Sequence, residues 1–421
     1  MGATVSYWRR VDLPRDVAKS ASAPLPIRSR TMTTFPTWPS YTEREVDAVA
    51  ETLRSNRVNY WTGTETREFE REFAAATDSR YAVALANGTL ALDLALKALD
   101  IGPGDEVIVT PRSFIASVSS VVSLGAKPVF ADVDRDSGNL SADTVAACIT
   151  DRTRAVIPVH LAGWPCDIHA LLSLCAPLDI AIIEDCAQAH GAAIGGKSVG
   201  SFGTVGAWSF CQDKIMTTGG EGGMVTTDDE GLWKRMWSYK DHGKSWDAVY
   251  ERDHAPGFRW LHEDFGTNWR MMEMQGVIGR IQLGLLDRWS ARRREIAGAY
   301  RAMLQPFADV VRAPWPDNPF RHAAYRFYAY VRPDGLAVGW SRDRIVAEVS
   351  ALGLPLLHGT CSEIYLEKAF EGTGLAPELR LPNARELGET SLMFLTHPTL
   401  EETHVSAICD GVARILARAS K

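Results

Sequence analysis

The sequence predicts an α/β protein in which a mostly parallel sheet, covered by helices, is followed by a smaller α+β part. Short apolar runs alternate with amphipathic helical stretches between about residues 81 and 225. A long helical pattern follows at about 271–305, and a strand with two further helices comes after Pro306. Alternating strands and helices are typical of a parallel sheet with helices on both faces, and this alternation is the basis of the predicted class.

Two domains are expected from the length of the chain. Its 421 residues exceed the roughly 250 to 300 at which a single hydrophobic core stops growing. We place a large domain at residues 32–290 and a small C-terminal domain at residues 291–421. Residues 1–31 are polar and contain three prolines, so we expect a flexible extension there. One hypothesis makes Met32 the natural start, and the alternative is an arm that packs on a partner subunit.

The elements of the large domain are expected in the following order. A helix capped near Thr42 comes first and ends near Leu53, because threonine is a favoured N-cap residue. The sheet then takes its strands from short apolar runs bounded by turns. These runs are 81–86, 106–110, 128–133, 155–161 and 180–184.

The C-terminal part is predicted from helical periodicity. Apolar residues recur at helical spacing over 271–305, interrupted by nothing stronger than glycine, which favours one long helix that bridges the domains. A strand is expected at 325–331, followed by a helix capped by Ser341. The last helix carries four apolar residues on one face, namely Val405, Ile408, Val412 and Ile415.

Composition and charge exclude several function classes. The chain is 46% hydrophobic and 23% charged, as soluble globular proteins are, and its net charge of -7 indicates no basic surface for nucleic acid. No apolar run approaches the roughly 18 residues of a membrane span. The seven cysteines lie singly, which favours reduced thiols over disulfides or a zinc site. We expect a cytoplasmic protein without a metal, nucleic-acid or membrane site.

Lys214 is the most informative residue of the sequence. It lies in the glycine-rich run WSFCQDKIMTTGGEGG, 29 positions after Asp185 at the end of an apolar strand. A lysine amine forms a Schiff base with the aldehyde of pyridoxal phosphate (PLP), and a carboxylate keeps the pyridine nitrogen of that cofactor protonated. Without such a cationic partner, the Asp185 carboxylate would be costly to bury. Together the two residues predict a PLP enzyme.

Other residues could hold the phosphate and the ring of this cofactor. Gly88 and Thr89 follow Asn87 in a turn from strand to helix, where free backbone amides favour an anion, although an ordinary helix cap is the alternative. Ser209 could add a hydroxyl to this phosphate site. Phe114 follows a strand end and could stack on the pyridine ring, or it could be a core aromatic.

Two residues after Asp185 could also take part. Gln188 lies three positions beyond it and could reach a cofactor oxygen. His190 could orient the Asp185 carboxylate, or it could be a core histidine.

Six pieces of the chain resemble the DegT/StrS family of sugar aminotransferases, which are fold-type-I PLP enzymes acting on nucleotide-linked keto sugars. The resemblance covers about residues 40–415. It implies transfer of an amino group from an amino acid, expected to be glutamate, to a nucleotide-linked keto sugar in polysaccharide or natural-product biosynthesis. The pieces are NGTLALDLAL, GDEVIVTPRSFIAS, GAKPVFADVD, IIEDCAQAHGA, GSFGTVGAWSFCQDKIMTTGGEGG and GTNWRMMEMQGVIGRIQL.

The resemblance also implies a role for each matching residue. Lys214 would bind the cofactor aldehyde and Asp185 the pyridine nitrogen, with Phe114 stacked on the ring. Asn268, in GTNWRM, matches an asparagine that reaches the cofactor phosphate of the neighbouring subunit, so a homodimer with shared active sites is implied. The remaining implied contacts are Gly88, Thr89 and Ser209 to the phosphate and Gln188 to a ring oxygen.

Two histidines are candidate substrate contacts, and Lys214 bears on the reaction type. The family often places a histidine against the substrate, and LPLLHGTCSEIYLEKAF offers His358 in a different setting. His160, at a strand end, is the second expected substrate contact. Some relatives carry histidine in place of the lysine and dehydrate a sugar, so Lys214 favours transamination over a PLP-dependent dehydratase or lyase. A non-catalytic regulatory protein is the other alternative.

Turnover requires Lys214 without its proton, because only the neutral amine attacks the cofactor or accepts a proton. The usual pKa of a lysine is about 10.4. We expect burial and neighbouring positive charge to lower it. The amino group would pass from the donor to the cofactor, giving pyridoxamine phosphate, and from there to the sugar.

Overall fold

The computed structural model describes residues 34–254, 256–257 and 259–421, and residues 35–421 form one compact unit. The extension predicted at residues 1–31, together with Met32, lies outside the described residues. The first helix, α1 (Glu43–Arg54), begins after Thr42 as expected. The backbone amide of Thr42 donates to Glu45 Oε2 at 3.0 Å, which completes a capping box.

A seven-stranded sheet, ordered β1-β9-β8-β5-β4-β2-β3, forms the centre of the unit. Only β9 runs against its neighbours, so the sheet is mostly parallel and the predicted α/β class is confirmed. The five predicted strands are β1 to β5, with small shifts of their ends. The strands are β1 (Tyr81–Leu85), β2 (Glu106–Val109), β3 (Lys127–Phe130), β4 (Thr153–Ile157), β5 (Ala181–Asp185), β8 (Val205–Ser209) and β9 (Gly223–Thr227).

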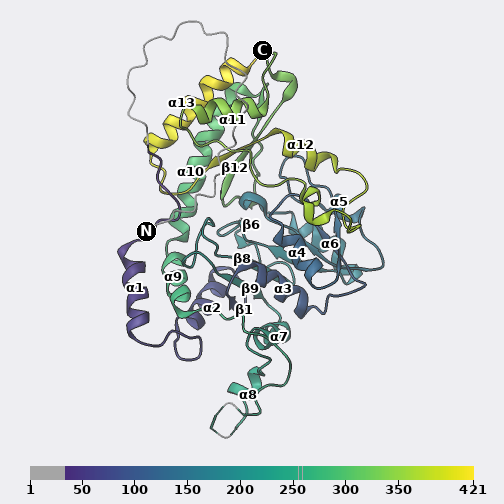
Figure 1. Cartoon of the computed structure of the whole chain (residues 1–421), viewed down its shortest axis with the longest axis vertical. Coiled ribbons are helices and arrows are strands. Elements are labelled where there is room, and N and C mark those ends of the chain that lie inside the picture. Colours follow the sequence, from purple (N-terminus) through teal and green to yellow (C-terminus); the bar gives the residue numbers. More distant parts are fainter. Residues whose placement is uncertain (1–33, 255, 258) are drawn as a thin grey trace. The chain divides into compact units, whose positions relative to one another are not determined.

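Helices cover both faces of this sheet (Figure 1). Successive residues of a strand point to opposite sides, so the sheet contributes to two hydrophobic clusters. One cluster joins the sheet to α3, α4 and α7, and the other joins it to α2, α5 and α6. These helices are α2 (Glu65–Ala76), α3 (Gly88–Ala98), α4 (Ala116–Ser123), α5 (Ala142–Ala146), α6 (Ile168–Cys175) and α7 (Glu230–Lys240).

The single long helix expected over 271–305 was wrong, because two helices occupy this stretch. α9 (Glu273–Leu283) ends before Gly284, and α10 (Leu286–Leu304) begins two residues later. The amide of Leu285 donates to the carbonyl of Gln282 at 2.9 Å, a three-residue spacing that tightens the last turn of α9. Glycine is a poor helix former, costing about 1 kcal/mol relative to alanine, and here it does end the helix.

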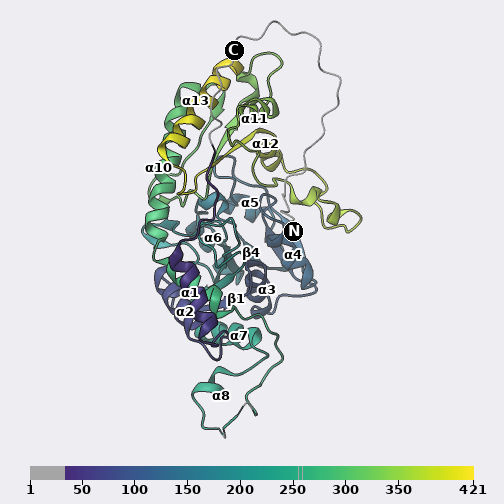
Figure 2. The ribbon, with the colours of Figure 1, turned by 60° about the vertical axis from the view of Figure 1, so that its left-hand side comes forward.

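The C-terminal part is built on a three-stranded antiparallel sheet, ordered β10-β12-β13. Helices α10 and α13 lie side by side in both views (Figures 1 and 2), and both contribute to the core of this part. The Ser341 hydroxyl accepts from the Arg344 amide and caps α11 as expected. The elements are β10 (Val311–Arg312), β12 (Arg326–Val331), α11 (Arg342–Ala351), α12 (Pro382–Thr390), β13 (Ser391–Leu395) and α13 (Glu402–Ala419).

The two parts pack closely against each other. The amide of Ile364, in the C-terminal part, donates to the carbonyl of Pro111 beyond β2 at 2.9 Å. Tyr365 and Phe370 join the core of the large sheet, where both contact Phe130. A short sheet of β6 (Ala193–Ile194), β7 (Lys197–Ser198) and β11 (Phe320–Arg321) also joins the two parts. The boundary near residue 290 falls inside α10, and we keep it as a proposal.

Candidate active site

Several of the predicted residues meet at the carboxyl edge of the large sheet. Asp185 ends β5, Ser209 ends the neighbouring strand β8, and Gly88 begins α3. Lys214 lies in the loop from β8 to β9. This edge is where open α/β sheets bind their ligands. Residues from three separate sequence motifs are therefore brought to one region.

Two donors hold the Asp185 carboxylate in place. The Ser117 hydroxyl of α4 donates to Oδ2 at 2.8 Å, and the Ala187 amide donates to Oδ1 at 3.1 Å. Burial raises the pKa of Asp185 above its usual value, although these hydrogen bonds and the charge of Lys214 oppose the rise. A carboxylate has about four acceptor sites. It therefore keeps acceptor positions for a cationic group, as the pyridine nitrogen of PLP requires.

Lys214 is surrounded mainly by acidic groups. Its side chain is 15% exposed, and Nζ lies 3.8 Å from Asp213 Oδ1. Burial lowers the pKa of Lys214, but its interactions with Tyr325, Asp213, Cys211 and Asp185 outweigh that effect and raise the pKa above its usual value. The expectation of a lowered pKa was wrong for the cofactor-free chain, because anionic neighbours, and not cations, dominate.

The turn at residues 87–89 has the close packing that a phosphate cradle needs. The Asn87 side chain caps α3 by accepting from the Leu90 amide at 3.0 Å. A Cβ atom on Gly88 would lie 2.5 Å from Ser209 Cβ, so only glycine lets the helix start approach the end of β8 this closely. The first amides of α3 and the Ser209 hydroxyl therefore lie side by side, which fits an anion.

The ring contacts also fit the cofactor. Phe114, in the turn between β2 and α4, is 66% exposed, so its ring is available for stacking and does not belong to the core. Gln188 Oε1 accepts from the Ala162 amide at 2.8 Å. Because this bond uses the oxygen, the amide nitrogen is the end that can donate to an oxygen of the cofactor. With Asp185, Lys214 and the phosphate cradle, the residues present fit PLP.

The two histidines expected to contact substrate lie in different surroundings. His160 is buried, its Nε2 lies 3.0 Å from Glu184 Oε2, and its Nδ1 accepts from the Cys166 amide at 2.9 Å. Both ring nitrogens are used inside the protein, so the structure argues against direct substrate contact by His160. His358 is on the surface of the C-terminal part, 3.4 Å from Asp343, and its substrate role stays a prediction.

His190 does not orient Asp185. Among the described residues, neither of its ring nitrogens has a hydrogen-bond partner. The ring packs among Phe73, Trp208 and Phe210, and burial lowers its pKa to about 3. His190 is therefore a neutral core histidine, which was the alternative offered by the sequence.

Asn268 lies on an arm formed by residues 241–270. The arm carries the short helix α8 (Trp246–Tyr250) and projects away from the large sheet (Figures 1 and 2), while its base stays at the sheet, where the Ala86 amide donates to the Trp269 carbonyl at 3.0 Å. Asn268 is exposed, and its Oδ1 accepts from the Arg270 amide at 3.5 Å. Its predicted contact with the cofactor of another subunit stays a prediction.

Sequence reasoning missed three residues that support the site. Ser117 holds Asp185, and Trp38 Nε1 donates to the carbonyl of Lys214 at 2.7 Å across 176 positions of sequence. Tyr325, just before β12, donates its hydroxyl to Asp213. In the sequence, only the carboxylate of Asp213, directly before the lysine, indicated a supporting group near Lys214. Trp38 and Tyr325 come from distant segments, so no local pattern in the sequence indicated their contacts.

In the part of the chain that the structure describes, no helix has both the length and the apolar character needed to cross a membrane.

Residues 39–413 match the profile of the DegT/DnrJ/EryC1/StrS aminotransferase family. Spore coat polysaccharide biosynthesis protein SpsC of Bacillus subtilis is 33% identical over 89% of this chain and 95% of its own. A GDP-perosamine synthase of Caulobacter vibrioides is 38% identical over 69% of this chain and 76% of its own.

Further relatives agree with this match. The dTDP-3-amino-3,4,6-trideoxy-alpha-D-glucose transaminase of Streptomyces venezuelae is 36% identical over 87% of this chain and 90% of its own. Among solved structures, an aminotransferase from Psychrobacter cryohalolentis is 57% identical with a TM-score of 0.91, covering 92% of this chain and 100% of that one. DesV of S. venezuelae is 33% identical with a TM-score of 0.79, covering 90% and 95%.

Proposed function

Because this chain belongs to the DegT/DnrJ/EryC1/StrS aminotransferase family, we propose that it transfers an amino group to a nucleotide-linked keto sugar at the site around Lys214. It is a PLP-dependent aminotransferase of fold type I. The substrate class is supported by relatives that are named for GDP-linked and dTDP-linked amino sugars. The observation that carries the proposal is the meeting of Lys214, the buried Asp185 carboxylate and the start of α3 at one sheet edge.

Each part of the cofactor has a residue proposed to hold it. The amides of Gly88 and Thr89 and the hydroxyl of Ser209 would bind the phosphate, because they form the packed start of α3. The Asp185 carboxylate would hold the proton on the pyridine nitrogen, and the exposed ring of Phe114 would cover the pyridine face. When bound, PLP supplies an aldehyde for attachment and an electron sink for the reacting carbon.

Lys214 is the proposed proton carrier. After its release from the cofactor, neutral Nζ would take a proton from the α-carbon of the amino donor. In the second half of the reaction, the same Nζ would give a proton to the sugar carbon that receives the amino group. Glutamate is the proposed donor on the family resemblance. The seven cysteines are free, which supports a cytoplasmic location for the enzyme.

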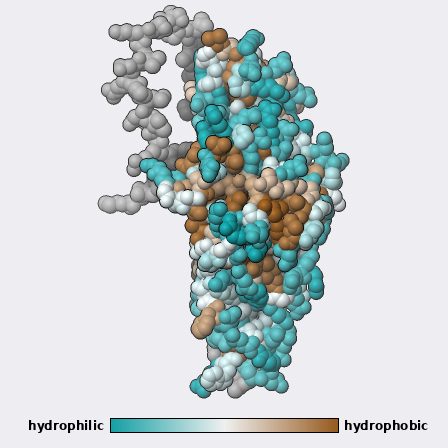
Figure 3. All heavy atoms as spheres, turned by 90° about the vertical axis from the view of Figure 1, so that its right-hand side faces the viewer, coloured by the Kyte–Doolittle hydropathy of each residue, from teal (hydrophilic) through white to brown (hydrophobic). Residues whose placement is uncertain are grey.

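A homodimer is the proposed assembly. The arm at residues 241–270 leaves Trp260 and Phe265 91% and 94% exposed, and large exposed aromatic rings are typical of interaction surfaces. Asn268 lies on the same arm and would reach the phosphate site of the partner. Figure 3 shows that hydrophobic side chains also gather midway along the face on the right of Figure 1.

The proposed reaction is tested with the purified full chain, glutamate and a panel of nucleotide-linked keto sugars. We expect one 2-oxoglutarate for each sugar whose carbonyl becomes an amine, measured by product mass. K97A, which alters an exposed lysine of α3, serves as the matched control. K214A should lose at least about a thousandfold in rate, because proton transfer and attachment both fail.

Two results would contradict the proposal in different ways. A dehydrated sugar without 2-oxoglutarate would make the protein a dehydratase. Transamination retained by K214A would remove Lys214 from the reaction and leave the family assignment intact.

A further inference from the structure

Asp213 connects Lys214 to the C-terminal part of the chain. The Tyr325 hydroxyl donates a hydrogen bond to Asp213 Oδ2, and a guanidinium nitrogen of Arg326 lies 3.6 Å from the same oxygen. The other carboxylate oxygen, Oδ1, lies 3.8 Å from Lys214 Nζ. One half-exposed carboxylate therefore joins the start of β12 to the amine of the lysine.

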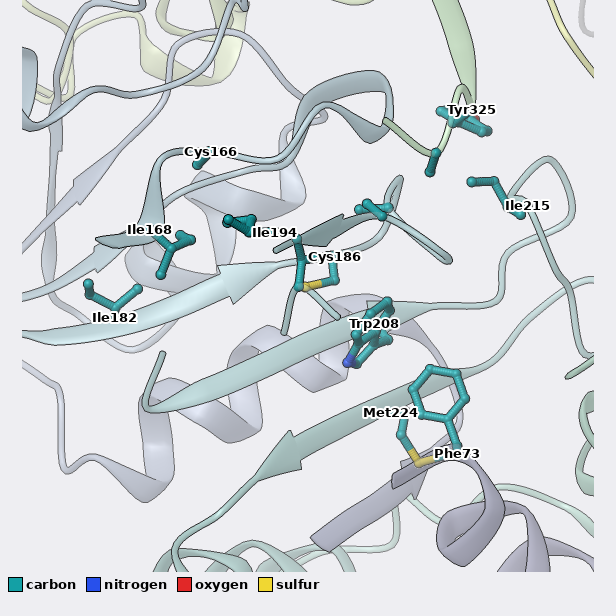
Figure 4. Packing of buried hydrophobic residues seen from close by; sticks show 14 of the residues in the cluster. Phe73, Cys166, Ile168, Ile182, Cys186, Ile194, Trp208, Ile215, Met224 and Tyr325 are labelled. Atoms are coloured by element: carbon teal, nitrogen blue, oxygen red, sulfur yellow. The ribbon is translucent and has the colours of Figure 1, made fainter. Parts of the chain in front are cut away.

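The two residues that hold Asp213 are themselves held. Tyr325 is buried and belongs to the same core cluster as Ile215, the residue directly after Lys214; the two lie close together in Figure 4. The guanidinium of Arg326 lies 4.2 Å from the centroid of the Tyr325 ring, and Lys214 Nζ lies 5.4 Å from it. The position of the Asp213 carboxylate is thus set by packed side chains and not by its own loop.

Neighbouring groups keep Asp213 charged and offset part of that charge. Burial would raise the pKa of Asp213, but Lys214, the Tyr325 hydroxyl and Arg326 together lower it below its usual value. Asp213 is therefore an anion at neutral pH, and Arg326 offsets part of its charge. The titratable and charged groups around Lys214 and Asp213 are Asp185, His190, Cys211, Tyr325, Arg326 and Arg293 of α10.

We propose that Asp213 is a positioning residue: held by Tyr325 and Arg326, it keeps the Lys214 amine in place whenever that amine is free. The proposal rests on the proposed function, in which Lys214 is the catalytic lysine. A released amine at the end of a flexible side chain would otherwise sample many rotamers.

The first test measures Lys214 directly in the cofactor-free full chain. The protein is labelled briefly with acetic anhydride at pH 8, and acetylation of Lys214 is quantified by peptide mass spectrometry against an added reference amine. D213N should increase the labelling roughly three- to tenfold, because removing an opposite charge within about 4 Å favours the neutral amine. D167N, which alters an exposed N-cap aspartate of α6, is the matched control and should change nothing.

The second test uses turnover of the loaded enzyme. Y325F should lower kcat roughly tenfold with little change in KM, because the amine is misplaced after substrate has bound. Y300F, which removes another buried tyrosine hydroxyl, bonded to the Leu395 carbonyl, is the control. If Tyr325 acts through Asp213, the variant D213N/Y325F should lose no more than D213N alone.

The outcomes separate this proposal from the proposed function. Unchanged labelling of Lys214 in D213N would overturn the positioning role, even if the enzyme transaminates sugars. Additive losses in D213N/Y325F would overturn the link through Tyr325. Increased labelling in D213N, in a protein that acts on no nucleotide-linked sugar, would support the positioning role and contradict the proposed substrate class.

Discussion

The Asp185 carboxylate depends on a hydroxyl from another element, and this dependence can be measured. S117A removes the donor to Oδ2. Because burial already raises the pKa of Asp185, losing this donor raises it further and weakens the hold on a protonated pyridine nitrogen. We expect roughly ten- to hundredfold weaker PLP binding, since a hydrogen bond to a charged group contributes about 1.5 to 3 kcal/mol. Fluorescence titration at pH 6 and pH 8 should show the larger loss at pH 6.

The control for S117A lies on the same helix. S123A removes an exposed hydroxyl that donates to the Ser120 carbonyl within α4 and interacts with Asp93 of α3, but not with Asp185. Equal losses of PLP affinity in S117A and S123A would mean that the helix, and not the contact with Asp185, is responsible.

Residues could be predicted from the sequence where their chemistry is local. Lys214 with its glycine-rich run and Asp185 at a strand end carry their own signals, and so does the turn at Gly88. His160 was misread because a strand end does not reveal whether a side chain points to solvent or into the protein. Tyr325 could not be found, because its partner Asp213 lies 112 positions away in sequence.

His322 makes the stability of the fold depend on pH. It is buried, its Nδ1 accepts from the Ala324 amide at 2.8 Å, and burial, with the charge of Arg294, lowers its pKa to about 3. Below its usual pKa of about 6.5, the unfolded chain binds a proton at this residue and the folded chain does not. The free energy of unfolding should therefore fall as pH drops from about 6.5 toward 3, by up to about 1.4 kcal/mol per pH unit for this histidine.

A variant without a titrating ring isolates this effect. H322N keeps an acceptor for the Ala324 amide, so its urea unfolding should show a weaker loss of stability between pH 7 and pH 5 than the wild-type chain. H169N alters an exposed histidine and should keep the wild-type slope. If H322N and the wild-type chain have the same slope, His322 is not a source of the acid sensitivity.

At the scale of elements, the start of α3 combines tight packing with anion binding. A Cβ atom at Gly88 would lie 2.5 Å from Ser209 Cβ, so G88A must push α3 away from β8. We expect the free energy of unfolding to fall by about 1 to 3 kcal/mol. The free energy of PLP binding should fall by a larger fraction of its wild-type value. G298A is the matched control, because nothing lies within 4 Å of its added Cβ in α10. It should add about 0.5 to 1 kcal/mol of stability and leave PLP binding unchanged.

The spacing of apolar residues in the sequence was sufficient to predict some elements and not others. The strands β1 to β5 were found because apolar runs between turns have few alternatives in a parallel sheet. The division between α9 and α10 was missed, since the apolar pattern continues through Gly284 in both helices. The Gln282 side chain accepts from the Thr217 amide at 2.8 Å, a tertiary contact at the end of α9 that periodicity does not contain.

At the scale of the whole molecule, the proposed homodimer makes the arm at residues 241–270 necessary for a complete active site. Its exposed Trp260 and Phe265 carry large apolar area that a partner would cover. Changing both to serine should give a monomer, measured by light scattering, because the apolar contact is lost. The monomer should bind PLP more weakly, since its phosphate site would lack the partner's Asn268. A stable dimer in this variant would place the interface elsewhere.

The proposed sharing of active sites makes a stronger prediction for mixed dimers. K214A and N268A should each be nearly inactive, the first without its lysine and the second without the proposed phosphate contact. In a heterodimer purified through two different tags, one site combines Lys214 from one chain with Asn268 from the other and is intact. Such a heterodimer should recover roughly half of the wild-type activity per dimer, because one of two symmetric sites is complete. Activity no higher than the mean of the two parent variants would show that each chain builds its site alone.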